Sequence, residues 1–244
     1  MAVTDSALPR ASSIASQLNL PVSSASTKAN QLLVDTDGLS LSIPDIGKAI
    51  SIDFSVGKYD HRRKFGGGRG QPLAKAIGLK KGLSPRVIDA TAGFARDAFV
   101  IASLGCEVRM VEQNFLLCLL IDDAINKHVD DDELAVILNR MRIKNHNAID
   151  YLKTLTEPAE VIYMDPMYPG RDKSALVKKE MQLLHQLIGP DTDSEELLAV
   201  AREIALKRVV VKRPKGADFV GDKKPNVSIE SKNTRYDVYV TTLD

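Results

Sequence analysis

The most informative segment follows a short apolar run late in the chain. The run Val161 to Met164 predicts a buried strand, and Asp165-Pro166-Met167-Tyr168-Pro169 comes directly after it. Two prolines within five residues fix φ and remove backbone donors, so the loop is stiff and leaves carbonyls free beside a carboxylate. Asp165 and a nearby carbonyl can accept both N–H groups of an exocyclic amine, while Tyr168 can stack on the ring that carries the amine. The segment therefore predicts chemistry at a planar amine, with Asp165, Pro166 and Tyr168 as catalytic residues; the alternative is a rigid structural turn.

Two earlier strand ends carry residues suited to a nucleoside. Asp89 ends one predicted strand, and a loop of small residues that includes Gly93 then opens a helix. Small residues let a ligand approach the backbone closely. Glu112 ends the next predicted strand, where an acid can accept both hydrogen bonds of a ribose diol. Each feature alone could be an ordinary connection or a solvent-facing acid, but together they favour a nucleoside-containing cofactor.

The elements that must position these residues alternate along the chain. Strands are expected at 86–90, 106–112, 142–145, 160–165 and 208–212, with helices at 96–104, 115–127, 130–140, 148–155, 174–188 and 194–206. Such alternation predicts a mainly parallel sheet that is covered on both faces. Two further strands, 227–231 and 236–241, have no helix between them, which predicts an antiparallel hairpin at the edge of the sheet.

The 244 residues divide into three predicted parts. Residues 1–55 form a small α+β N-terminal piece, in which Ile14 and Leu18 suit a short helix and Asp37-Gly38 between apolar runs predicts a hairpin. Residues 56–85 form a basic, Gly-rich, polar connector. Residues 86–244 form the domain that holds the predicted site.

The charge is almost balanced overall but unevenly distributed. A formal net charge of +1 excludes a protein that coats nucleic acid by charge alone. Basic residues nevertheless gather in the connector and near the predicted site, which favours phosphate contact; the alternative is a solvated face. We expect the following to contact phosphate at the active-site edge: Arg62, Arg63, Lys64, Arg69, Lys173, Lys178, Lys212 and Arg213.

Other classes of protein find little support in the sequence. No apolar run approaches the roughly 20 residues of a membrane span, so no membrane partner is expected. Cys106 and Cys118 with four histidines offer no zinc spacing, so no metal is expected, and two cysteines suit a reduced, cytoplasmic protein. A nicotinamide-dependent oxidoreductase is a weak alternative, because the G-x-G-x-x-G turn is missing.

At this point the motifs resemble those of known proteins. Asp165 to Tyr168 resembles the [Asn/Asp/Ser]-Pro-Pro-[Tyr/Phe] motif of amino-group methyltransferases. More closely, the chain resembles the RsmJ family over roughly residues 50–240, through the stretches 61–70, 89–97, 165–169, 173–181 and 208–214. The resemblance implies a Rossmann-like class I methyltransferase fold that uses S-adenosyl-L-methionine. It also implies methylation of guanine N2 in 16S ribosomal RNA, either as RNA or within a 30S subunit or its precursor.

The resemblance also implies roles for residues of a cofactor pocket. Arg96 and Asp97 would line the methionine end, Glu112 would hold the ribose with Gln113 beside it, and Asn147 and Ala148 would flank the adenine. Asp89 and Gly93 would complete the pocket, and Asp165 would lie between cofactor and base. Ala95 stands where such turns usually have Gly, so we expect an ordinary backbone conformation there.

The sequence is also compatible with other functions. The Asp-Pro-x-Tyr motif also permits a methyltransferase for DNA, a free nucleotide or a protein glutamine. A non-catalytic RNA-binding assembly factor could keep the same fold, although intact Asp89, Glu112 and Asp165 argue against it. A monomer is expected, since nothing in the sequence indicates an obligate dimer.

Overall fold

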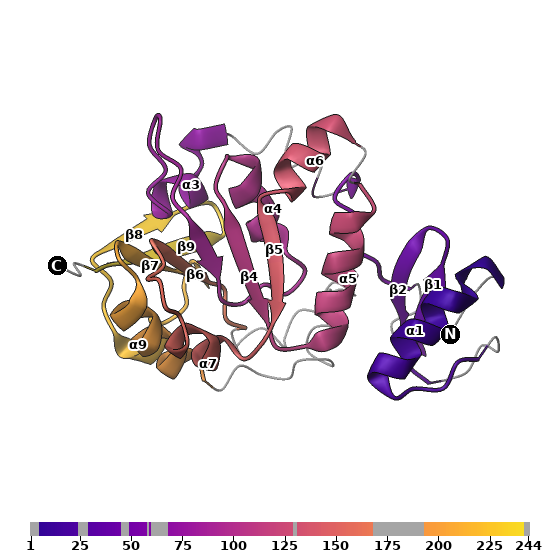
Figure 1. Ribbon diagram of the computed structural model, residues 1–244. Helices are drawn as coiled ribbons and strands as arrows, with labels where there is room; N and C mark the ends of the chain where they lie inside the picture. Colours follow the sequence, from indigo (N-terminus) through magenta and orange to yellow (C-terminus); the bar gives the residue numbers. More distant parts are fainter. Residues whose placement is uncertain are drawn as a thin grey trace.

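A single mixed β-sheet organises the molecule. The computed structural model describes residues 5–23, 29–44, 49–57, 59, 68–128, 131–167 and 193–241. Within these residues, seven strands follow the order β5-β4-β3-β6-β7-β9-β8 (Figure 1). Their bounds are β3 Val87–Asp89, β4 Val108–Glu112, β5 Met141–Asn145, β6 Val161–Met164, β7 Arg208–Pro214, β8 Val227–Glu230 and β9 Thr234–Val240.

The strand directions create a crevice at the centre of the sheet. Strands β5, β4, β3, β6 and β7 are parallel, and β9 runs antiparallel to both β7 and β8. The chain moves outward from β3 to β5 and then returns to β6 on the other side of β3. Ligands of open α/β sheets bind where the strand order reverses in this way. The predicted parallel sheet with an antiparallel edge hairpin is therefore confirmed.

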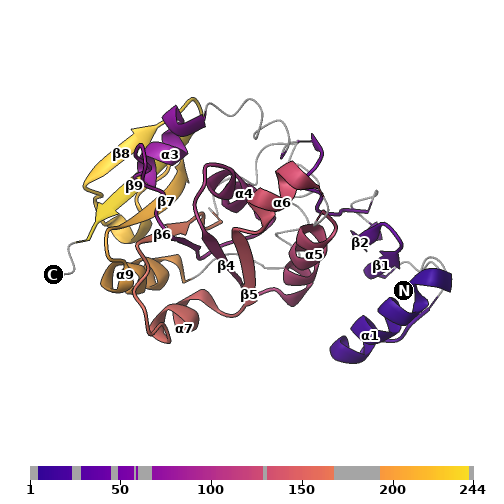
Figure 2. The same ribbon diagram turned by 45° about the horizontal axis from the view of Figure 1, so that its top comes forward.

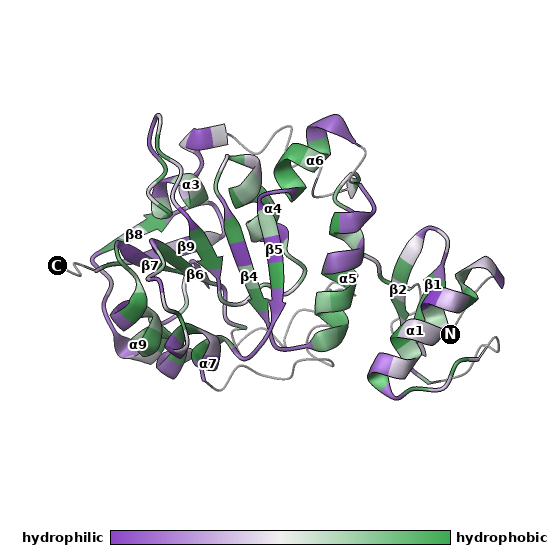
Figure 3. Cartoon of the chain, viewed as in Figure 1, coloured by the Kyte–Doolittle hydropathy of each residue, from purple (hydrophilic) through white to green (hydrophobic). Residues whose placement is uncertain are grey.

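Helices cover both faces of the sheet. The helices α4 Arg96–Ser103, α5 Phe115–Asn126 and α6 Asp132–Leu138 pack on one face, and α7 Ala148–Lys153 and α9 Ser194–Ile204 on the other. Successive strand residues point to opposite faces, so Val161 and Tyr163 enter one core cluster while Ile162 and Met164 enter the other. Figure 3 shows the hydrophobic residues gathered on the central strands and the hydrophilic ones on outer turns of the helices.

The N-terminal residues form a separate small unit beside α5 (Figures 1 and 2). Helix α1 Leu8–Leu18 precedes the hairpin of β1 Gln31–Asp35 and β2 Gly38–Ser42, which confirms the predicted helix and hairpin. Asp123 of α5 holds this unit, because its carboxylate pairs with Arg10 and its Oδ2 accepts a hydrogen bond from the Leu39 backbone N–H at 2.7 Å. The Asp53 carboxylate likewise pairs with Lys127 and His128 just after α5.

The predicted polar connector is partly wrong, because a stretch of it belongs to the core. Residues Pro72–Ala76 form helix α3, and Leu73, Ala74 and Ala76 are at most 1% exposed. This short helix packs against β8 and β9 at the edge of the sheet. The apolar residues were too few to predict the helix, and only the long-range contact with the final hairpin supplies the partner surface.

Candidate functional site

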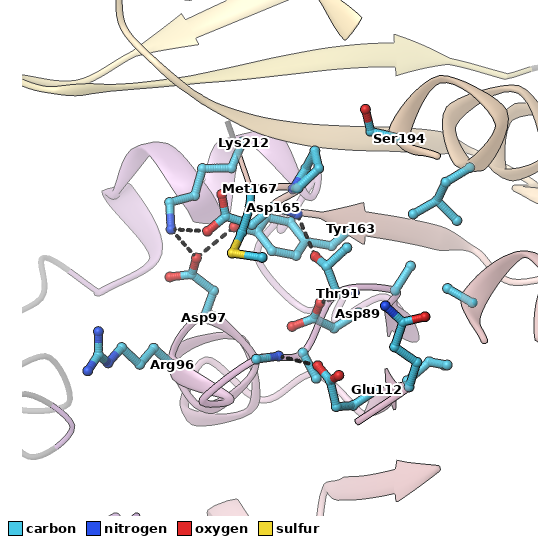
Figure 4. A pocket seen from close by; sticks show the side chains of 18 of the residues that line it. Asp89, Thr91, Arg96, Asp97, Glu112, Tyr163, Asp165, Met167, Ser194 and Lys212 are labelled. Carbon is cyan, nitrogen blue, oxygen red and sulfur yellow. Dashed lines mark hydrogen bonds and ion pairs between the residues drawn. The ribbon is translucent and has the colours of Figure 1, made fainter. Parts of the chain in front are cut away.

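A cavity of about 370 Å³ opens at the carboxyl ends of β3, β4, β6 and β7. It lies at the point where the strand order reverses, and Figure 4 shows its side chains converging from these elements. The structure brings all nine predicted cofactor residues to this one cavity: Asp89, Gly93, Arg96, Asp97, Glu112, Gln113, Asn147, Ala148 and Asp165. Pro166 also lines it.

The loop between β3 and α4 forms the floor of the cavity. Gly93 and Ala95 both have left-handed backbones, with φ values of 53° and 56°. The expectation of an ordinary conformation at Ala95 is therefore wrong. The Ala95 backbone N–H donates to the Ala92 carbonyl at 2.8 Å, so a tight turn fixes the conformation even though it costs an L-residue about 1 kcal/mol. The turn lets α4 begin at once, directly beneath the cavity.

Glu112 joins this loop to the end of β4. Its Oε2 accepts a hydrogen bond from the Gly93 N–H at 3.0 Å, and its Oε1 accepts one from the Asn114 N–H at 2.8 Å. The side chain is almost fully buried, and Asn114 in turn caps the N-terminus of α5. Each carboxylate oxygen has more than one acceptor position, so a carboxylate that lines the cavity can also accept hydrogen bonds from the hydroxyl groups of a ligand.

A cluster of charges occupies the other end of the cavity (Figure 4). The Lys212 Nζ lies 2.6 Å from the Asp97 Oδ2 and 2.7 Å from the Asp165 Oδ2. The Tyr163 hydroxyl donates to the same Asp97 Oδ2 at 2.7 Å. The Thr91 Oγ1 accepts a hydrogen bond from the Asp165 N–H at 2.6 Å, which ties the loop after β6 to the loop after β3.

Burial and charge together set the protonation of this cluster. Burial lowers the pKa of the Lys212 ammonium, but the carboxylates of Asp165 and Asp97 outweigh that effect and raise it above its usual value. Burial raises the pKa of the Asp165 carboxyl, against the opposing charge of Lys212. Burial also raises the pKa of Asp89 to about 8, so this carboxyl keeps its proton at neutral pH. Lys212 is therefore a fixed positive charge among acids.

Three predicted phosphate contacts do not fit the structure. Lys212 points into the cavity between two carboxylates rather than toward solvent. Arg213 is 7% exposed, and its Nε and Nη2 donate to the Asp218 carbonyl at 3.1 and 3.0 Å. Arg69 donates a hydrogen bond to the Ser84 side chain. Ser84 precedes β3, so it lies at the amino ends of the parallel strands, whereas the cavity lies at their carboxyl ends. Spacing in the sequence could not reveal these orientations.

Several predictions fall on residues outside the described part of the chain. They concern Tyr168 of the proposed catalytic loop, the predicted phosphate contacts Arg62, Arg63, Lys64, Lys173 and Lys178, and the helix expected at 174–188. These remain predictions.

The structure adds side chains that the sequence reasoning missed. Tyr163 precedes Asp165 by two residues, so the period of a strand already places both on one face of the sheet. Thr91 and Ser194 line the cavity from the loop after β3 and the start of α9. Ser194 lies far from the other site residues in sequence, and no local signal could have found it.

Neither a metal-binding group of side chains nor a membrane-spanning helix is found within the described ranges. No group of three or more His, Cys, Asp or Glu side chains there could hold a metal ion. None of the helices there has the length and apolar character needed to cross a bilayer.

The chain is similar to known proteins over most of its length. Residues 13–241 match the model of a family described as SAM-dependent methyltransferase. The chain belongs to this family. S-adenosylmethionine is accordingly its cofactor, and the cavity fits that group: it has a buried acid at the end of β4, a small-residue turn after β3 and room for a nucleoside.

Relatives of this methyltransferase agree over most of its length. It is 47% identical to the ribosomal RNA small subunit methyltransferase J of Aeromonas hydrophila over 236 residues, which are 95% of this chain and 93% of the relative. It is 48% identical to the protein of the same name from Shewanella oneidensis over 213 residues, or 86% of either chain. The crystal structure of a SAM-dependent methyltransferase from Neisseria gonorrhoeae is 31% identical, with a TM-score of 0.77 over 98% of this chain and 94% of that one.

These relationships confirm the resemblance to the RsmJ family, the class I fold and the enzymatic activity. They leave the nicotinamide-dependent oxidoreductase and the non-catalytic assembly factor without support.

Proposed function

We propose that this methyltransferase transfers the methyl group of S-adenosylmethionine to N2 of a specific guanosine in 16S ribosomal RNA. The observation that carries the proposal is the Asp165 carboxylate, which follows β6 directly and lies in the same cavity as the cofactor residues. The relatives at 47% and 48% identity, named for small-subunit ribosomal RNA, support the substrate. Because the proposed substrate is ribosomal RNA, we expect a cytoplasmic enzyme that acts as a monomer.

The proposed cofactor contacts follow the shape of the cavity. Asn147 and Ala148 flank the adenine, and the Asn147 side chain already caps α7 through hydrogen bonds from Ile149 and Asp150, which fixes its position. Glu112 accepts hydrogen bonds from the ribose hydroxyls, with Gln113 beside it. Four more residues, Asp89, Gly93, Arg96 and Asp97, surround the methionine end, and Asp165 lies between the cofactor and the target base.

Positioning accounts for most of the proposed catalysis. When bound, S-adenosylmethionine supplies a methyl group on a sulfonium leaving group, so no covalent enzyme intermediate is needed. The target base must leave its stack to reach the cavity. Asp165 then orients the amine, Pro166 keeps the loop rigid, and Tyr168 stacks on the base. Holding the nitrogen in line with the methyl group is the effect that these residues provide. Asp165 or water accepts the proton that the amine loses.

The RNA must also be held outside the cavity. We retain Arg62, Arg63, Lys64, Lys173 and Lys178 as proposed phosphate contacts, because they flank the segments that carry the site in the sequence. Either the RNA or a 30S subunit or precursor could present these phosphates.

Mass spectrometry of ribosomal RNA tests the proposed function. Cells that lack the gene should lose one N2-methylguanosine from 16S RNA, and the wild-type gene should restore it. Asp165→Ala should not restore it, although the purified variant should still unfold cooperatively in urea, which shows that it folds. An unchanged set of N2-methylguanosines in the deletion strain would overturn the proposal.

A further inference from the structure

Lys212 stands in a position where it can read the target base. We propose that Lys212 makes the site specific for guanine by donating a hydrogen bond to O6 while Asp165 accepts hydrogen bonds from N1–H and the N2 amine. This inference rests on the proposed function, because it concerns the base that enters the same cavity. It assigns Lys212 to base recognition rather than to the phosphate contact that the sequence suggested.

The strand register brings Lys212 beside Asp165. Strands β6 and β7 are parallel neighbours, and Met164 pairs with Val211 in the ladder. Asp165 follows β6 directly and Lys212 is the next residue of β7, so both lie at the carboxyl ends of the parallel strands, where the cavity opens. Figure 4 shows the Lys212 ammonium between the carboxylates of Asp97 and Asp165, with Met167 alongside.

Two acidic partners hold the ammonium in a defined place. The Asp97 Oδ2, which also accepts the Tyr163 hydroxyl, fixes Lys212 from one side, and Asp165 fixes it from the other. Lys212 keeps 26% of its side chain exposed, and an ammonium has three N–H groups. These two carboxylates use two of them, so the third can donate to a ligand that enters the cavity.

The resulting pattern complements guanine and opposes adenine. Along its pairing edge guanine presents an acceptor at O6, a donor at N1 and a donor at the N2 amine. The Lys212 Nζ lies 2.7 Å from the Asp165 Oδ2, so a donor and an acceptor stand side by side in the order that matches O6 and N1–H of guanine. Adenine would turn its own amine toward the ammonium and an unprotonated nitrogen toward the carboxylate. A site built for hydrogen bonds rejects a base that leaves those groups unpaired.

Lys212 could instead serve only to neutralise the acids that surround it. Asp97 is buried, and both Asp97 and Asp165 pair with the Lys212 ammonium. Charge compensation alone would affect folding and cofactor binding, but it would not change which base is accepted. The preference between two bases therefore separates the two roles.

The test compares two target bases in two enzymes. After the modified nucleotide is mapped, a ligated 16S RNA carries either guanosine or 2,6-diaminopurine at that position. Diaminopurine keeps the N2 amine, so the methyl acceptor is unchanged, but it replaces O6 with a second amine and has no proton on N1. Single-turnover methylation of both RNAs is measured with the wild type, with Lys212→Met and Lys212→Arg, and with Lys153→Met as the matched control. Lys153 pairs with Glu196 at the surface, with 53% of its side chain exposed.

We expect the wild type and Lys153→Met to prefer guanosine by roughly 100-fold, in the range that good base contacts provide. The preference for guanosine over diaminopurine should fall at least about tenfold in Lys212→Met. It should fall less in Lys212→Arg, because the guanidinium still carries hydrogen-bond donors. The salt dependence of RNA binding should stay unchanged in Lys212→Met, because no phosphate contact is lost. An equal preference in the wild type and in both Lys212 variants would overturn the inference. A wild type that methylates no guanosine would instead overturn the proposed function.

Discussion

Asp89 should make the stability of this methyltransferase fall as the pH rises. The carboxyl is 2% exposed at the end of β3, and burial raises its pKa from 3.8 to about 8. Below pH 4 the folded and unfolded states both hold this proton. Between pH 4 and pH 8 the unfolded chain releases it while the folded chain retains it, so the folded state loses relative stability. Above pH 8 both states are ionised and the penalty is constant.

The magnitude follows from the size of the shift. Each unit of pKa difference corresponds to about 1.4 kcal/mol, so the change from pH 4 to pH 7 has an upper limit of about 4 kcal/mol. Asp89→Asn removes the titrating proton and keeps an oxygen that can accept the hydrogen bond from the Thr91 N–H, which is 3.1 Å long in the wild type. The variant should therefore be more stable than the wild type at pH 7.5 by a few kcal/mol, and about equal near pH 4.5.

Urea unfolding at several pH values, without cofactor, measures this difference. Titrating groups far from Asp89 contribute equally to both proteins, so they cancel when the two free energies of unfolding are subtracted. Asp37→Asn, at an exposed turn of the N-terminal hairpin, is the matched control for loss of one carboxylate. A difference between the wild type and Asp89→Asn that does not change from pH 4.5 to pH 7.5 would show that Asp89 is ionised in the folded protein, which would refute the reasoning.

Three further predictions address the cofactor loop, its support and the RNA contacts. Ala95→Gly should stabilise the protein by up to about 1 kcal/mol, since it relieves a left-handed alanine; a loss of stability in urea unfolding would contradict this. Phe54→Ala should lower the free energy of unfolding by about 3–5 kcal/mol, because the fully buried Phe54 ring stacks on the ring of Phe99 in α4, with the two ring centroids 5.0 Å apart. A decrease of less than 1 kcal/mol in the same assay would contradict that packing. Replacing both Arg62 and Arg63 with Ala should reduce the slope of log binding constant against log salt by about 1.5; an unchanged slope in filter binding would exclude phosphate contact.

The sequence determined the central sheet and most of the cavity. Alternating apolar strands and helices predict a parallel sheet, and the carboxyl ends of parallel strands meet at one edge. The local positions of Asp89, Glu112 and Asp165, each at the end of a strand, were therefore enough to predict that they gather at one site. The short turn after β3 and the two prolines after Asp165 are likewise local features that the sequence displays directly.

Only the tertiary structure decided how the charges within the site are paired. Lys212 reaches Asp97 across 115 residues of sequence and Asp165 across 47, and a basic run in the sequence gives no indication of where each side chain points. The left-handed Ala95 and the burial of α3 were also beyond local reasoning, because contacts with distant segments outweigh the preference of single residues. Local patterns determined which strands and turns form the cavity; packing between distant strands decided which charges face each other inside it.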